Sequence, residues 1–168
     1  MKRAFWTMLL ASFALTACAT GAEKPKRICP QVAIVRALEK AADFGQEAAD
    51  PANLVSVAVM QKVEGACDYS DKGVTVDFTL KMFAQKGPRL GGDRASFPFF
   101  ASIVDAADKV KAKELMTAEF TFSSDKNVAE YNQPLRIFIP LAVDEDASTI
   151  RVLTGFQLTE AQLKAVGK

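Results

Sequence analysis

The sequence predicts an all-β domain, an immunoglobulin- or fibronectin-III-like β-sandwich of about seven strands, over residues 29–168. Three observations support this class. Apolar and polar residues alternate along several short segments, polar turn residues separate these segments every 8 to 14 residues or so, and helical patterns are few and short. A signal-peptide helix is expected before the domain and a short helix after it.

The clearest strand covers residues 74–82, where every second residue is apolar, the pattern of a strand with one buried face. Its apolar face carries Val74, Val76, Phe78, Leu80 and Met82. The other expected strands are residues 32–36, 54–63, 97–103, 116–122, 135–141 and 150–158.

In the strand expected over residues 54–63, the apolar face is interrupted by Gln61. We expect this face to point into the core; it carries Val55, Val57, Val59 and Val63. A long connection ending in the turn at residues 71–73 would join this strand to the next in a hairpin. Pro98 indicates an edge strand or the start of a strand, because proline cannot donate to the ladder.

Two short helices are expected beside the strands. Residues 37–44 are rich in alanine and end before Gly45. At the other end of the domain, Thr159 and Gln162 have the spacing of a capping box, which predicts a brief helix to Val166 that covers a sheet edge.

The first 17 residues have the organisation of a secretory signal peptide. Lys2 and Arg3 precede an uncharged, strongly apolar run over residues 4–17. This run is too short for a membrane-spanning helix, which needs about 20 residues. The alternative, a buried helix of a cytosolic domain, would place apolar residues on all faces of one surface helix.

The end of this run, Leu15-Thr16-Ala17-Cys18, resembles the lipobox of bacterial lipoproteins. The resemblance implies that the signal peptidase cuts before Cys18 and that Cys18 carries a diacylglycerol and an acylated amine. Two or more acyl chains anchor a protein stably, whereas one does so only marginally. The alternative is ordinary cleavage near Ala17, which would leave Cys18 as an exposed free thiol.

Cleavage before Cys18 would leave a chain of ordinary single-domain size. Removal of residues 1–17 takes away Lys2 and Arg3, so 19 basic residues face 20 acidic ones. This balance argues against nucleic acid as a partner. Residues 18–28 are small, polar and basic, and they are expected to form a tether between the lipid and the domain.

Cys29 and Cys67 are the two remaining cysteines. In an exported protein we expect them to form a disulfide, because the periplasm is oxidising. The alternative is a pair of buried free thiols. The expected bond would link the first strand to the connection after the second.

The chain contains no histidine, which excludes Ser-His and Cys-His catalysis and imidazole zinc sites. We therefore expect no enzyme, metal or cofactor. Residues 86–94 form the candidate ligand loop, in which Lys86, Arg89 and Arg94 surround three glycines. Backbone N–H groups and positive charge could together contact an anion there; the alternative is a plain hairpin loop.

Several short motifs span residues 29–163 and resemble a family of uncharacterised envelope lipoproteins of proteobacteria. They are Cys29-Pro30-x-Val32-Ala33, Gly65-x-Cys67-x-Tyr69, Gly73-Val74-x-Val76-Asp77, Gly87-Pro88, Ala112-Lys113-Glu114, Ile139-Pro140-Leu141 and Gly155-Phe156-Gln157-Leu158-Thr159. The resemblance implies an envelope-anchored domain and brings no activity. In enteric lipoproteins an Asp after the lipidated cysteine retains the protein in the inner membrane. By this resemblance, Ala19 after Cys18 favours the outer membrane over the inner one.

The sequence thus leads to three functional hypotheses. The first is a non-enzymatic envelope lipoprotein that faces the periplasm and binds an envelope protein or supports an assembly. The second is a small-ligand or glycan binder that uses residues 86–94. The third and weakest is a hydrolase whose catalytic carboxylates come from distant loops.

Overall fold

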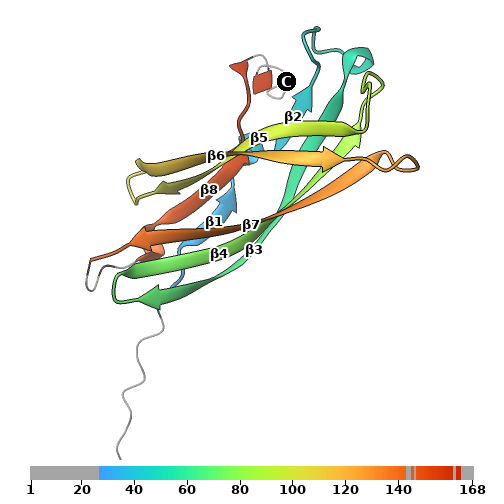
Figure 1. Cartoon of the computed structure of the whole chain (residues 1–168). Helices are drawn as coiled ribbons and strands as arrows, with labels where there is room; N and C mark the ends of the chain where they lie inside the picture. Colours follow the sequence, from blue (N-terminus) through green and yellow to red (C-terminus); the bar gives the residue numbers. More distant parts are fainter. Residues whose placement is uncertain (1–26, 143–144, 146, 161, 164–168) are drawn as a thin grey trace, which may run out of the picture.

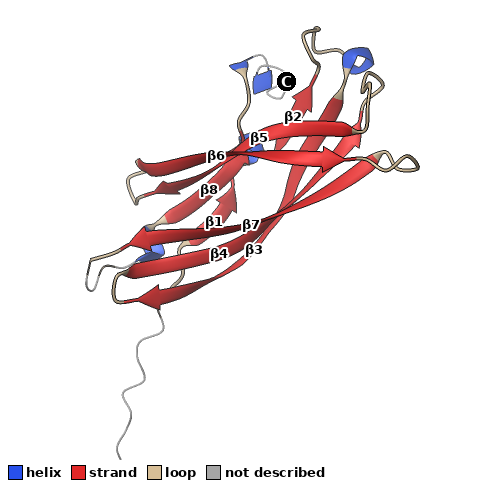
Figure 2. Cartoon of the chain, viewed as in Figure 1, coloured by secondary structure: helices blue, strands red, loops and turns tan. Residues whose placement is uncertain are grey.

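The computed structural model describes residues 27–142, 145, 147–160 and 162–163, which form two four-stranded sheets packed face to face (Figures 1 and 2). The first sheet contains, in order, β1 (Gln31–Ile34), β8 (Arg151–Phe156), β5 (Arg94–Val104) and β6 (Val110–Thr121). The second contains β2 (Lys40–Asp43), β3 (Ser56–Ser70), β4 (Gly73–Lys86) and β7 (Val128–Pro140). Short 3-10 turns η1 (Arg36–Leu38), η2 (Pro51–Asn53) and η3 (Ala147–Thr149) lie in the connections. The all-β sandwich predicted from the sequence is confirmed.

All neighbouring strands pair antiparallel except β1 and β8, which run parallel. The β3–β4 and β5–β6 hairpins each stay within one sheet, whereas the connection from β4 to β5 crosses between the sheets. Constant-type immunoglobulin domains place four strands, A, B, E and D, against C, F and G. The strand order here is a different one, so the likeness to those domains lies in the two-layer architecture.

The core lies between the sheets and is rich in aromatic side chains. The Phe97 ring centroid lies 6.0 Å from that of Phe120 and 5.8 Å from that of Phe156, within the range of favourable aromatic pairs. The alternation predicted for residues 74–82 is confirmed, since its five apolar side chains are all buried.

In β3 the expected inward face is wrong for the first half of the strand. The buried residues are Ser56, Ala58 and Met60, not the neighbouring valines. A register shift between Met60 and Lys62 leaves Gln61 as the extra residue of a β-bulge. One inserted residue reverses the alternation, so that Val63 packs against the core, as the sequence predicts.

Residues 37–44 do not form the expected helix. The chain makes the short turn η1 and then β2, which pairs with β3 from Lys40↔Val59 to Asp43↔Ser56. Helix propensity is a weak preference that tertiary pairing overrides, and burial of Ala41 in the core adds to that pairing. The sandwich therefore has eight strands in the part of the chain that the structure describes.

Two expectations at the ends of elements have different outcomes. Pro98 lies in the interior strand β5, not at a sheet edge. Its missing N–H group costs no hydrogen bond with β8, because β8 ends opposite Phe99 and does not reach Pro98. The capping box is confirmed: the Thr159 amide donates to Gln162 Oε1 and the Gln162 amide to Thr159 Oγ1. Gln162 Nε2 also donates to the Ala42 carbonyl, so the C-terminal turn covers the β2 edge as predicted. The signal-peptide helix, Cys18 and the predicted end of the last helix at Val166 lie outside the described residues.

Candidate functional site

Three contacts fix the first described residues to the end of β3. Cys29 and Cys67 form a disulfide with their Cα atoms 5.7 Å apart. The Tyr69 hydroxyl donates to the Ile28 carbonyl at 2.5 Å, and the Arg27 guanidinium lies 5.2 Å from the Tyr69 ring centroid. The predicted pairing is confirmed, although Cys67 lies within β3 because this strand is longer than expected. These contacts attach the start of the domain to β3.

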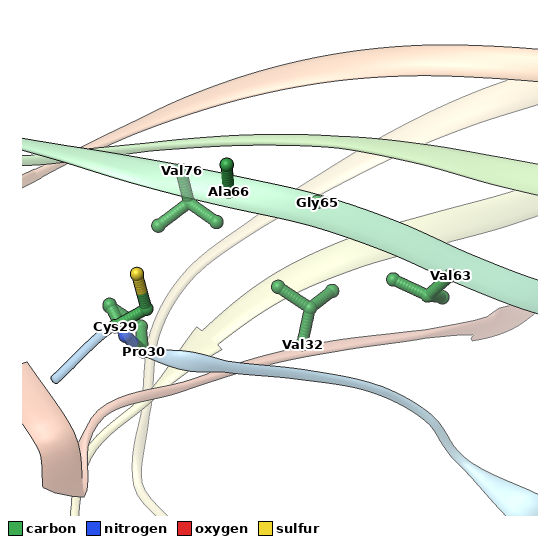
Figure 3. Close-up of a pocket in the computed structure, with 7 residues that line it drawn as sticks. All are labelled: Cys29, Pro30, Val32, Val63, Gly65, Ala66 and Val76. Atoms are coloured by element: carbon green, nitrogen blue, oxygen red, sulfur yellow. The ribbon is translucent and has the colours of Figure 1, made fainter.

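A small cavity of about 210 Å³ lies beside this disulfide, between β1 and the β3–β4 hairpin (Figure 3). Val32 and Val76 point into the space between the two ribbons, and Val63 lines its far side. No charged side chain lines the cavity. Its chemistry is that of a shallow apolar recess, without groups that could fix the orientation of a ligand.

The three cations of the candidate ligand loop lie at the opposite end of the sandwich from the disulfide (Figure 1). Lys86 is the last residue of β4, Arg94 the first of β5, and Arg89 lies in the connection between them. The Lys86 ammonium lies 3.5 Å from the Ser123 carbonyl and 5.4 Å from the centroid of the Phe122 ring. It is therefore engaged by the β6–β7 connection, whereas Arg89 and Arg94 are exposed.

Backbone hydrogen bonds hold the base of this loop. The Gly87 amide donates to the Val55 carbonyl at 2.8 Å and the Arg89 amide to the Leu54 carbonyl at 3.1 Å. A Cβ atom at Gly87 would collide with the Leu54 carbonyl, which explains the glycine. Gly91 and Gly92, in contrast, face open space. The loop is a crossover between sheets with a fixed base and an open tip, not a hairpin.

An open cleft of about 370 Å³ separates the start of β6 and the adjoining part of β5 from the end of β7. Its lining combines five apolar residues (Ala101, Ile103, Ala112, Ile137 and Phe138) with three charged ones (Lys113, Glu114 and Arg136). The cleft arises because the first six residues of β6 are exposed on both faces. It is larger than the cavity beside the disulfide.

Arg136, one of the two cations that line this cleft, is neutralised by Asp77 on the neighbouring strand β4. Arg136 Nε and Nη2 donate to the two carboxylate oxygens of Asp77 at 2.7 and 3.2 Å, a bidentate pair. The Arg136 hydrogen bond holds the pKa of the Asp77 carboxyl below its usual value, with desolvation opposing and the guanidinium charge reinforcing it. Arg136 is therefore not a free anion-binding group.

The described residues contain no group of three or more histidine, cysteine or acidic side chains that could hold a metal ion. The Glu145 carboxylate caps its own turn by accepting from the Ala142 amide at 2.8 Å. Within the described part of the chain, no helix has the length and apolar character required to cross a bilayer.

Comparison with models of protein families, with curated proteins and with solved structures finds no match for this chain. The cleft and the exposed first half of β6 were not predicted from the sequence, because this strand was expected to begin at residue 116. The alternating run Val110-Lys111-Ala112-Lys113 was the available signal.

Proposed function

We propose that this chain is a cell-envelope lipoprotein, anchored through lipidated Cys18, whose β-sandwich binds or supports another envelope component without catalysis. The lipobox-like Leu15–Cys18 at the end of an apolar run carries the proposal. The disulfide between Cys29 and Cys67 supports it, because structural disulfides persist in oxidising compartments such as the periplasm. With Ala19 after Cys18, we place the anchor in the outer membrane.

The arrangement of the domain fits a binding role. The disulfide and the Tyr69 contacts attach the tether to one end of the sandwich, and the glycine tip of residues 87–93 lies at the other end (Figure 1). The long strand edges and the cleft lie along the side between these ends. Strand edges and loops of this kind are the surfaces that protein partners use for strand addition and docking.

The anchor is tested by comparing the wild-type chain with Cys18→Ser in a bacterial host. We expect the wild type in the membrane fraction, with an intact mass that begins at acylated Cys18, and the variant as the unprocessed precursor. A Cys29→Ala/Cys67→Ala variant is the matched control, since it should still be processed and acylated. Normal processing and acylation of Cys18→Ser would refute the anchor.

The binding role is tested by crosslinking in intact cells followed by mass spectrometry. A partner protein recovered in stoichiometric amount, and lost when its contact residues are replaced, supports the proposal. A purified protein that retains a defined small molecule and crosslinks to no protein would contradict it and favour the ligand loop. Loss of that molecule in Arg89→Ala would then locate its site.

A further inference from the structure

Strand β6 lies at the edge of its sheet: it is hydrogen-bonded to β5 on one side, and no described strand is hydrogen-bonded to it on the other (Figure 1). It is 12 residues long and contains no proline. The other edges are less open: β1 and β2 have four residues each, and β7 carries Pro134 within the strand. A long edge strand of this kind is a template for pairing with another chain.

Edge lysines normally block such pairing, but here they turn back over their own sheet. Lys113 Nζ lies 2.7 Å from Gln157 Oε1 and 4.5 Å from the Phe100 ring centroid. Lys111 Nζ lies 3.5 Å from an Asp105 carboxylate oxygen in the β5–β6 turn. These acceptors lie on the β5 and β8 side of the strand, so the outer edge of β6 is left open.

Exposed side chains on the outward face of β6 suit pairing with an identical strand. Leu115 is 62% exposed. If two β6 strands pair antiparallel about Leu115, the two leucines oppose each other and Lys111 of each copy faces Glu119 of the other. Lys111 can keep its contact with Asp105 and also bond to Glu119, because an ammonium has three donors. This register places an apolar pair between two pairs of opposite charge, which are favourable cross-strand combinations.

We propose that a second copy of this chain pairs with β6 edge to edge, antiparallel about Leu115, to form a two-fold symmetric dimer. The interface is isologous, as in most soluble dimers. Residues 110–120 of the two copies form one ladder, and the two four-stranded sheets become a continuous sheet of eight. The proposal does not depend on the anchor or on the binding role proposed above.

Thiol crosslinking of the full chain tests this register. Leu115→Cys places two thiols on the symmetry axis, where facing Cβ atoms lie about 5 Å apart. Thr121→Cys is the matched control: it is exposed on the same face of β6, but the two copies of residue 121 lie about 40 Å apart in this register. With a short bifunctional thiol reagent, we expect a covalent dimer from Leu115→Cys. Thr121→Cys should give no more crosslinking than the unsubstituted chain, which reports any reaction of Cys18.

A charge exchange tests the same register without relying on a single thiol. In the Leu115→Cys background, Lys111→Glu should reduce crosslinking about tenfold, because it opposes two pairs of carboxylates. Adding Glu119→Lys should restore it. Leu115 and Glu119 are exposed, so these variants should keep the far-ultraviolet circular dichroism of the parent.

Three outcomes would overturn the proposal. Equal crosslinking of Leu115→Cys and Thr121→Cys would show random collision, and absence of crosslinking from Leu115→Cys would show that another partner, or solvent, occupies the edge. Failure of the charge exchange to restore crosslinking would show that Lys111 and Glu119 do not face each other.

Discussion

Removal of the Cys29–Cys67 disulfide should lower the free energy of unfolding by about 4 kcal/mol. The bond closes a loop with a sequence separation of 38 residues. In the chain-entropy model, such a loop removes about 13 cal/mol/K from the unfolded state, or about 4 kcal/mol at 25 °C. The assay is urea unfolding of the Cys29→Ala/Cys67→Ala variant, followed by circular dichroism.

The dominant effect is expected in the unfolded state, because the Tyr69 contacts with Arg27 and Ile28 can still form without the bond. Reduction of the wild-type protein should therefore cost about as much as the double substitution. A loss below about 1 kcal/mol for the double variant would refute the loop-entropy reasoning.

Three further predictions concern the core, an ion pair and the bulge. Phe97→Ala should lower the free energy of unfolding in urea by about 3–5 kcal/mol, because Phe97 is 2% exposed. Phe138 is 50% exposed, so Phe138→Ala should change this free energy by no more than about 0.5 kcal/mol. Equal losses would contradict the assigned core. Arg136→Gln should raise the Asp77 pKa toward its ordinary 3.8 in a carboxyl NMR titration. In the wild type this pair's contribution is present above that pH and is lost as pH falls through the lower folded-state pKa; an unchanged Asp77 midpoint would contradict the pairing. Deletion of Gln61 should be tolerated, with a loss below about 1.5 kcal/mol, because it makes the pairing of β3 with β4 continuous; an unfolded deletion variant would contradict the assigned bulge.

The sequence predicted those parts of the fold in which local pattern and burial agree. The alternation of buried and outward residues predicted for residues 74–82 of β4 was correct at every position. This strand lies between two neighbours with one face on the core, so its alternation has no interruption. In β3 the same pattern predicted the wrong buried face for the residues before Gln61. The bulge at Gln61 reverses which alternate residues face the core, and the valines before it have the spacing of a buried face. The order of the strands could not be predicted, because it depends on long-range pairing that leaves no periodic signal.

The site residues show the same division between local and long-range information. The disulfide followed from the count of cysteines and the expected compartment, without any knowledge of β3. The Lys86, Arg89 and Arg94 loop was recognisable as a cluster, but the sequence could not show that the β6–β7 connection engages Lys86. The edge of β6 is open because Lys111 and Lys113 contact Asp105 and Gln157. Nothing in the sequence marks these two residues as partners of the lysines.

The proposed dimer and the proposed anchor together restrict how the domain could lie on a membrane. Antiparallel β6 strands are related by a two-fold axis perpendicular to the sheet, so the two disulfide-linked ends would point in opposite directions along the sheet. Both copies can reach one bilayer equally only if this axis is normal to the membrane and the sheets lie flat on it. Residues 18–28 can span at most about 35 Å, whereas two packed sheets are about 10 Å apart. The tether is therefore long enough for this orientation, in which the 87–93 tips of the two copies lie at the far ends of the dimer.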